Sequence, residues 1–203
     1  MPKPEAPRKV IRQQNLWPTP IWQTQIWEFM RSKTRVTFNE DFIGWIQSKM
    51  KDDNSVRKSN RGGWQSDLFK ASGEFDPLAK EIAGFVSHLN LGIDKIKIPQ
   101  LWVNVNKKGD WNTIHQHGQF TLAGTYYVKV PEDSGRIVFR DPRPAAIGNK
   151  FMVDRFDKGE FFNIKPLEGM LIIWPSYLDH FVEPSNSDEE RISISFDIVI
   201  INK

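Results

Sequence analysis

Alternating apolar and polar residues dominate the chain after residue 100. Short runs rich in Val, Ile, Phe and Tyr are separated by turn residues, with no helical pattern between them. This spacing predicts an antiparallel sandwich or barrel. Strands are expected near 101–106, 112–117, 121–130, 136–140, 160–165, 169–174, 180–184 and 191–201. The predicted fold is mainly β with flanking helices (α+β), and its core is a double-stranded β-helix, or jelly roll.

Two segments in the first hundred residues have apolar positions at helical spacing, and they follow a strand-like stretch at 20–26. Asn39 is predicted to cap the first helix and Asp76 the second, which has Pro77 in its first turn. The apolar stripes are Phe42, Ile43, Ile46 and Met50 in the first helix, and Leu78, Ile82, Phe85, Val86 and Leu89 in the second. We expect about two helices to brace one face of the β core.

Length and composition limit the class of protein. The 203 residues are 39% hydrophobic and 26% charged, which is enough for one domain with a buried core. Residues 1–15 are predicted to be a flexible basic leader, because Pro2, Pro4 and Pro7 disfavour a helix and a secretory apolar core is absent. Residues 16–203 would form a single domain. No apolar run approaches the roughly 18 residues of a spanning helix, so we expect a cytoplasmic protein without a membrane partner.

The absence of cysteine excludes several kinds of site, and the distribution of charge bears on the kind of partner. The chain has no cysteine, which excludes disulfides, thiol nucleophiles and cysteine-ligated metal sites. Residues 1–70 carry 13 Lys and Arg against 7 Asp and Glu, whereas residues 71–203 carry 15 against 18. A solvated basic tail explains this asymmetry more simply than an anionic partner such as nucleic acid does.

Three of the four histidines stand at two places in the β region. His115 and His117 are two residues apart, so in a strand both imidazoles point to one face. His180 follows the apolar segment 169–175, and strands this far apart in sequence can face each other in a jelly roll. Three converging imidazoles can hold iron, zinc, copper or nickel. A His-x-His pair also arises by chance, and His88, on the polar side of the second helix, is expected to be a surface residue.

The last predicted strand alternates strictly between two kinds of residue. Ile192, Ile194, Phe196 and Ile198 share one face, and Arg191, Ser193, Ser195 and Asp197 share the other. Periodicity alone allows two interpretations. The polar face is either solvated, or it points inward so that Arg191 and Ser193 can grip a carboxylate.

The order His-x-His, a distant histidine and then Arg-x-Ser resembles that of the iron(II)/2-oxoglutarate-dependent oxygenases. The resemblance runs from about residue 102 to 196, and segments 122–128 and 169–180 are similar to strands of prolyl-hydroxylase-like members. Segments 59–66 and 139–143 further resemble an oxygenase subgroup common in marine phage genomes. A phage-encoded member would work in the host cytoplasm.

The resemblance implies a metal and cosubstrate core at about 101–200. Fe(II) would be held by His115, His117 and His180. The 5-carboxylate of 2-oxoglutarate would be bound by Arg191, Ser193 and Tyr127, and its 1-carboxylate by Asn104 and Asn106. The three histidines and Arg191 would be the catalytic set. The implied reaction uses O2, decarboxylates 2-oxoglutarate to succinate and hydroxylates a substrate such as a prolyl or other peptide residue, or a metabolite. Ascorbate is a candidate reductant.

His117 departs from the pattern, because most of the superfamily has Asp or Glu at this position. The third ligand is therefore either His117 or a carboxylate from Asp110 or Asp179. With three neutral ligands, metal retention would depend more on the negative charge of the cosubstrate.

Three alternative classes are also compatible with the sequence. Gly109 with the two histidines fits the start of a cupin motif, but Thr121 and Leu122 stand where the cupin glutamate belongs. A three-histidine zinc hydrolase or hydratase, or a dioxygenase that does not use 2-oxoglutarate, would accept the same ligands. A non-enzymatic jelly-roll binding module is the third possibility. Neither the cupin nor the three-histidine alternative explains Arg191-x-Ser193.

Substrate recognition is the least determined property. Segment 59–66 is predicted to frame the entrance, with Gly62 and Gly63 as a hinge, Trp64 as a lid residue and Arg61 beside them. Arg140 and Arg143 are compatible with contact to an anionic substrate or with a solvated turn. The substrate and the oligomeric state stay open.

Overall fold

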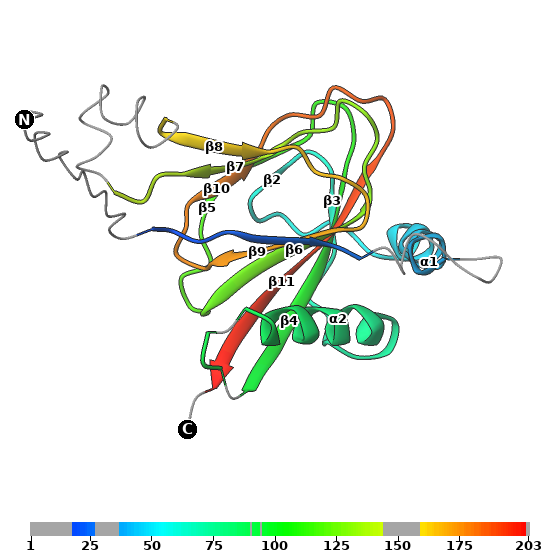
Figure 1. Cartoon of the computed structure of the whole chain (residues 1–203). Coiled ribbons are helices and arrows are strands. Elements are labelled where there is room, and N and C mark those ends of the chain that lie inside the picture. Colours follow the sequence, from blue (N-terminus) through cyan, green and yellow to red (C-terminus); the bar gives the residue numbers. More distant parts are fainter. Residues whose placement is uncertain (1–17, 27–36, 90, 94, 144–158, 202–203) are drawn as a thin grey trace, which may run out of the picture.

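The computed structural model describes residues 18–26, 37–89, 91–93, 95–143 and 159–201, and the predicted leader, residues 1–15, lies outside them. Two antiparallel sheets form the core (Figure 1). The larger sheet contains, in spatial order, β1 (Trp22–Gln25), β9 (Met170–Pro175), β6 (Leu122–Lys129), β11 (Arg191–Ile201), β4 (Lys95–Asn106) and β3 (Trp64–Gln65). The smaller contains β2 (Asn60–Arg61), β5 (Trp111–His115), β10 (His180–Val182), β7 (Ile137–Arg140) and β8 (Phe161–Ile164). The predicted double-stranded β-helix with two helices is confirmed, and each of the eight predicted strands is present.

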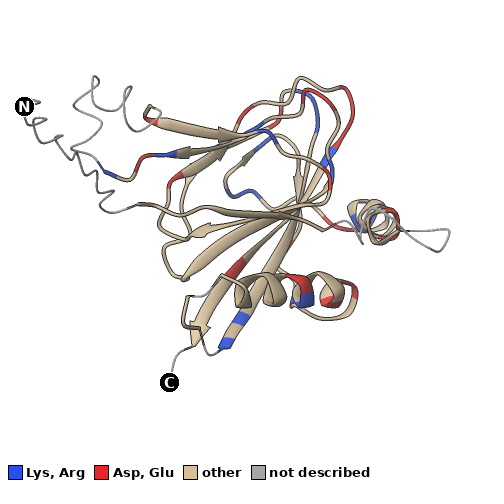
Figure 2. Ribbon diagram, in the orientation of Figure 1, with Lys and Arg blue, Asp and Glu red and all other residues tan. Residues whose placement is uncertain are grey.

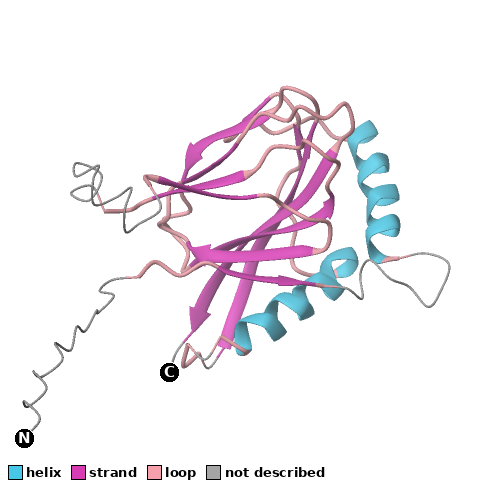
Figure 3. Cartoon of the chain, turned by 45° about the horizontal axis from the view of Figure 1, so that its top comes forward, coloured by secondary structure: helices cyan, strands magenta, loops and turns pink. Residues whose placement is uncertain are grey.

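The two helices, α1 (Phe38–Asp52) and α2 (Asp76–Ser87), lie on the same side of the molecule, against the larger sheet (Figure 3). Their buried residues join the apolar face of that sheet in one cluster. The cluster includes Phe42 and Ile46 of α1, Leu78, Ile82 and Val86 of α2, and Leu101, Val103, Ile192, Ile194, Phe196 and Ile198 of the sheet. Burying each of these side chains contributes roughly 1.5–3 kcal/mol, so the helices are held mainly by packing.

Helix α1 begins two residues earlier than predicted. Thr37, not Asn39, is its N-cap: the Thr37 side chain accepts from the Glu40 amide, and the Glu40 carboxylate accepts from the Thr37 amide. This is a capping box. Asn39 lies inside the helix and is buried, where it donates to the Val128 carbonyl and accepts from the Tyr126 hydroxyl. The prediction overlooked the Thr-x-x-Glu motif. It interpreted Asn39 as the cap, although this side chain forms buried hydrogen bonds instead.

Helix α2 also departs from its predicted cap. A short 3-10 turn, η2 (Gly73–Phe75), leads into the helix, so Phe75 is the N-cap and Asp76 is the first helical residue. Pro77 lies in the first turn as predicted. The helix ends at Ser87, which leaves Leu89 beyond it, and His88 is exposed as expected.

Successive side chains of β6 and β11 point to opposite faces of the larger sheet. One face packs beneath the helices, and the other faces the space between the two sheets. Tyr126 packs in the cluster under the helices, whereas its neighbour Tyr127 packs between the two sheets. On β11 the isoleucines and Phe196 face the helices, so the polar set faces the space between the sheets. Arg191, Ser193 and Asp197 are each at most 3% exposed. The inward interpretation of this strand is therefore the correct one.

The segment from Ser59 to Ser66 is a tight connection between the two sheets. Its β2 pairs with β5 in the smaller sheet, and its β3 pairs with β4 in the larger. Gly62 and Gly63 both have positive φ, and a Cβ on Gly62 would lie 2.0 Å from Asp110 Oδ1. Trp64 is buried and donates its indole N–H to the Asp53 carbonyl. The predicted lid role of Trp64 is therefore wrong, because its side chain belongs to the core.

Charged residues of both signs are interspersed on loops and helices, and most of the ribbon of the strands belongs to uncharged residues (Figure 2). Arg140 pairs with Glu160, and Arg143 pairs with Asp141. These pairings favour a structural role for both arginines. Among the described helices, none has the length and apolar character needed to cross a membrane.

Candidate metal centre

Two of the three clustered histidines are placed by strand pairing. His115 is the last residue of β5, His180 is the first of β10, and the two are direct cross-strand partners. His117 lies beyond the end of β5, so the predicted strand 112–117 is two residues too long. Its backbone is fixed nevertheless, because its amide donates to the Ser176 carbonyl at 2.8 Å and its carbonyl accepts from the Phe120 amide at 3.0 Å.

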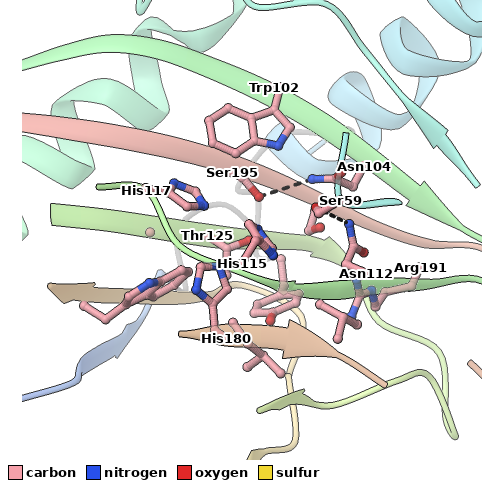
Figure 4. A pocket seen from close by; sticks show the side chains of 16 residues that line it. Ser59, Trp102, Asn104, Asn112, His115, His117, Thr125, His180, Arg191 and Ser195 are labelled. Carbon is pink, nitrogen blue, oxygen red and sulfur yellow. Dashed lines mark hydrogen bonds between the residues drawn. The ribbon is translucent and has the colours of Figure 1, made fainter. Parts of the chain in front are cut away.

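The three imidazoles converge on one point, as their spacing predicted. Their candidate ligand atoms lie within 4.8 Å of one another. The ring centroids are 4.3 Å apart for His115 and His180, 5.1 Å for His117 and His180, and 5.3 Å for His115 and His117. Figure 4 shows the three rings grouped in the pocket between the sheets, with Arg191 on its other side.

Each imidazole has an acceptor at its Nδ1 atom. Nδ1 of His115 lies 2.7 Å from the Thr113 carbonyl, and Nδ1 of His180 lies 2.9 Å from the Leu178 carbonyl. Nδ1 of His117 lies 2.6 Å from Asp197 Oδ1. We assign the proton to Nδ1 in all three rings, since each faces an oxygen, and this leaves the Nε2 lone pair free for a metal.

The surroundings of His115 and His180 favour the neutral, metal-binding form of these two imidazoles. Burial is the main cause that lowers the pKa of His115, and His117 adds to it. Burial lowers the pKa of His180 well below its usual value, and the neighbouring His115 and His117 lower it further. A neutral imidazole is the form that ligates a metal.

The carboxylates considered as alternatives to His117 are outside this cluster. Among the described residues, the group able to hold a metal consists of the three histidines. Asp110 Oδ2 instead accepts from the Lys107 amide at 2.7 Å, and this side chain packs against Gly62. Asp179 is near enough to His115 to raise its pKa, but it is not part of the cluster.

The other side of the pocket contains a buried cation. Arg191 is 2% exposed, donates to the Gly135 carbonyl and to Asn106 Oδ1, and has no hydrogen-bond partner at Nε. Its guanidinium lies 5.8 Å from the centre of the Tyr127 ring. No acidic residue of the described chain forms an ion pair with it. A buried guanidinium in this state fits an anionic ligand, because an unpaired buried charge is costly.

Two predicted neighbours of Arg191 line the same pocket. Tyr127 and Ser193 are both buried there. Burial raises the pKa of Tyr127 to about 12, although Arg191 acts in the opposite direction. The hydroxyl therefore keeps its proton at neutral pH and can donate to an anion. Burial lowers the pKa of Arg191, but a guanidinium remains charged in proteins.

The two asparagines of β4 are placed differently. Asn104 lines the pocket, donates to Ser195 Oγ at 3.2 Å, and has a buried Oδ1 with no partner. Asn106 is not on the pocket wall, and its Oδ1 accepts from Arg191 at 3.0 Å. This placement supports a role for Asn106 in orienting Arg191 rather than the predicted contact with the 1-carboxylate.

A second cavity, of about 700 Å³, adjoins the histidines and shares Ser59, Trp102, His115 and His117 with the inner pocket. Its further lining residues include Gln65, Ser66, Leu68, Gln100, Gln116 and Phe120. No site role was predicted from the sequence for Trp102, Gln100 or Asp197. Asp197 could have been found, because it shares the polar face of its strand with Arg191.

The donor set and the pocket fit an Fe(II) ion with a dicarboxylate. One candidate ligand nitrogen of each imidazole lies close to those of the other two, and a buried guanidinium that forms no ion pair in the described structure lies in the same pocket. Imidazoles suit iron, and the arrangement leaves coordination positions for other ligands.

The chain is similar to a known protein family and to several solved structures. The family described as "Putative 2OG-Fe(II) oxygenase" matches residues 100–197. No curated protein matches the sequence. A prolyl-4-hydroxylase from Pseudomonas putida is similar in structure, with a TM-score of 0.62, 14% identity, and 91% of this chain and 94% of that chain covered.

Two further prolyl hydroxylases have the same fold. The viral collagen prolyl hydroxylase from Paramecium Bursaria Chlorella virus-1, in complex with 2OG, has a TM-score of 0.57 and 19% identity over 88% of this chain and 94% of that chain. The prolyl hydroxylase from Trichoplax adhaerens, in complex with a hypoxia inducible factor peptide fragment, has a TM-score of 0.60 and 14% identity over 88% and 83%. At these identities the likeness establishes the fold alone.

Proposed function

We propose that this enzyme of the 2OG-Fe(II) oxygenase family, matched over residues 100–197, couples the oxidative decarboxylation of 2-oxoglutarate to the hydroxylation of a second substrate. The observation that carries the proposal is the pairing of two features in one pocket. Three histidines with free Nε2 atoms lie on one side, and the buried Arg191, without an acidic partner among the described residues, lies on the other. A metal alone would explain the first feature but not the second.

His115, His117 and His180 would hold Fe(II) through Nε2. Bound Fe(II), together with 2-oxoglutarate and O2, supplies the oxidising chemistry that side chains lack. The chain contributes rigid placement, because two of the ligands are cross-strand partners and the third is held by main-chain hydrogen bonds. The family match favours this class over the cupin, zinc-hydrolase and binding-module alternatives.

Arg191 would bind the 5-carboxylate of 2-oxoglutarate, and Ser193 and Tyr127 would donate to the same group. All three are buried on the pocket wall. Asn104 is the candidate contact for the 1-carboxylate, because its side chain lies on the wall and is only partly satisfied. The low dielectric of this pocket strengthens each charge-assisted hydrogen bond and excludes water that would compete for it.

The second substrate would reach the metal through the cavity of about 700 Å³, which His115 and His117 also line. Its wall mixes amide side chains with apolar ones and with the opposite charges of Lys58 and Asp67, and such a mixed surface can accept a peptide segment. We therefore keep a prolyl or other peptide residue as the proposed target. Segments 59–66 and 139–143 support assignment to the oxygenase subgroup common in marine phage genomes.

The test is turnover without the second substrate. Protein purified without oxygen and then given Fe(II), ascorbate, 2-oxoglutarate and air is expected to release succinate slowly. Isothermal titration should also detect 2-oxoglutarate binding to the metal-loaded protein. Absence of Fe(II)-dependent succinate, together with no 2-oxoglutarate binding up to millimolar concentration, would overturn the proposal.

A further inference from the structure

We propose that Asp197 is a positioning residue that supplies, through His117, the negative charge that a carboxylate ligand gives the metal in most oxygenases of this type. The inference rests on the proposed function and deepens it, because it concerns how a site of three histidines retains Fe(II). It assigns a role to a buried carboxylate that does not itself reach the cluster of metal-binding atoms.

The geometry of Asp197 fixes one imidazole. His117 Nδ1 donates to Asp197 Oδ1 at 2.6 Å, and Gln100 Nε2 donates to Asp197 Oδ2 at 2.7 Å. Gln100 and Asp197 are register partners on β4 and β11. Each carboxylate oxygen therefore has one donor: Gln100 lies on β4, and the backbone of His117 is held by main-chain hydrogen bonds just beyond β5. This arrangement sets the plane of the carboxylate and, through it, the orientation of the His117 ring.

The His117 ring is also held on its other sides. The Trp102 ring lies 5.5 Å from it between centroids, and the main-chain amide of His117 donates to Ser176. The His117 and Asp197 side chains are 9% and 2% exposed. Solvent therefore does little to screen the carboxylate from the imidazole, so a full charge at this position acts strongly on whatever the ring binds.

His117 is the one imidazole of the three whose Nδ1 partner is charged. His115 and His180 donate to main-chain carbonyls, which carry no net charge. His117 is also the position at which most related enzymes have Asp or Glu. His117 therefore combines two features: it is a neutral ligand where related enzymes have a charged one, and it is the ligand that donates to a carboxylate.

The net charge of the Fe(II) site explains why a carboxylate beside His117 would matter. Two neutral histidines and one carboxylate leave an Fe(II) site with a net charge of +1, whereas three neutral histidines leave +2. Counting Asp197 with His117 restores +1. Within the described structure Asp197 forms no ion pair with a lysine or arginine, and its two hydrogen-bond donors, Gln100 and a neutral His117, carry no charge to balance it. A cation at His117 Nε2 would satisfy the carboxylate, and the carboxylate would strengthen the imidazole as a ligand.

The test is a double-mutant cycle on metal affinity. Asp197→Asn and His117→Asp are made singly and together, and Fe(II) affinity is measured without oxygen by competition with a chromophoric chelator, with no 2-oxoglutarate present. In the parent, Asp197→Asn is expected to weaken Fe(II) binding by about 10–100-fold. In the His117→Asp background the same change is expected to leave affinity unchanged or to increase it, because two neighbouring carboxylates repel each other.

Asp179→Asn is the matched control. It removes an equal charge close to His115, and it is expected to weaken Fe(II) binding much less than Asp197→Asn does. A loss at Asp179 as large as that at Asp197 would overturn the inference, because it would show a general charge effect. An equal loss from Asp197→Asn in both backgrounds would also overturn it, since a merely structural role predicts that result. So would an unchanged affinity in the parent.

Two further measurements distinguish a failed role of Asp197 from a misfolded variant and from failure of the proposed function. Thermal unfolding of the metal-free variants identifies any that do not fold, and in that case the smaller, uncharged Asp197→Ser takes the place of Asp197→Asn in the cycle. If the parent protein itself binds no Fe(II), the proposed function fails. If the parent binds Fe(II) and the cycle shows no reversal, only the role of Asp197 fails.

Discussion

His115 and His180 face each other directly across two antiparallel strands, with their ring centroids 4.3 Å apart. The residues are 65 positions apart in the sequence, and the hydrogen-bonded pairing of β5 with β10 fixes their relative position. Because both lie on strands and not on loops, the pair provides a rigid base to which His117 adds the third nitrogen.

This pairing leads to an ordered prediction for the histidine variants. His115→Ala and His180→Ala should each weaken Fe(II) binding by more than the roughly 10–100-fold expected for an outer-shell change. His117→Ala should lie between these variants and the parent once 2-oxoglutarate is added, because the cosubstrate supplies ligands and negative charge. His117→Asp should retain binding, since two histidines and a carboxylate form an Fe(II) site.

Fe(II) affinity, measured with and without 2-oxoglutarate, checks this order. His88→Ala is the control, because His88 is exposed and its Nδ1 bonds only within its own helix end, to the Gly84 carbonyl. Parent-like metal affinity in His117→Ala would show that His117 is not a ligand.

Arg191→Ala should weaken 2-oxoglutarate binding while leaving metal binding in place. Truncating one partner of a buried charged pair costs roughly 2–5 kcal/mol, which corresponds to about one and a half to three and a half orders of magnitude in the dissociation constant. Calorimetric titration of the metal-loaded protein measures the change. Arg136→Ala, which removes an exposed partner of Glu183, should bind 2-oxoglutarate like the parent. Equal affinity in Arg191→Ala would remove Arg191 from the cosubstrate site.

Asn39→Ala should destabilise the fold more than loss of the α1 cap does. The change removes the acceptor of the Tyr126 hydroxyl and the donor to the Val128 carbonyl, both in the core, at a cost of about 1–3 kcal/mol. Thr37→Ala, which removes the capping box, should cost about 1 kcal/mol. Denaturant unfolding compares the two. The reverse order would mean that Asn39 contributes through local helix formation and not through its buried hydrogen bonds.

Two glycine substitutions should have opposite effects. In Gly124→Ala the new Cβ would lie 2.3 Å from the Phe196 ring and 2.8 Å from the Ile172 carbonyl oxygen, so overpacking should cost about 1–3 kcal/mol. Gly84 lies within α2 with no atom within 4 Å of the corresponding Cβ, and Gly84→Ala should stabilise by about 0.5–1 kcal/mol. Melting temperatures test both, and a stabilised Gly124→Ala would contradict the close approach of β6 to β11.

Local patterns predicted the elements well but their ends less well. The eight strands after residue 100 follow from period-two alternation, which depends on neighbouring residues and is visible in the chain itself. The start of α1 was misplaced because Thr37 and Asn39 are both good capping residues, and only the contact of Asn39 with Tyr126, 87 positions away, distinguishes them. The short pairing of residues 60–65 was missed because its strands are two residues each.

For the site, the sequence by itself determined which residue types can do the chemistry: two histidines at strand spacing, a third far along the chain, and an arginine and a serine on one face of the last strand. It could not determine which face of that strand points inward. The tertiary structure decided this, because the helices cover the isoleucine face and leave Arg191 and Asp197 between the sheets. Contact between Asp197 and His117, 80 positions apart, depends on the packing of two sheets, and no local pattern encodes such a contact.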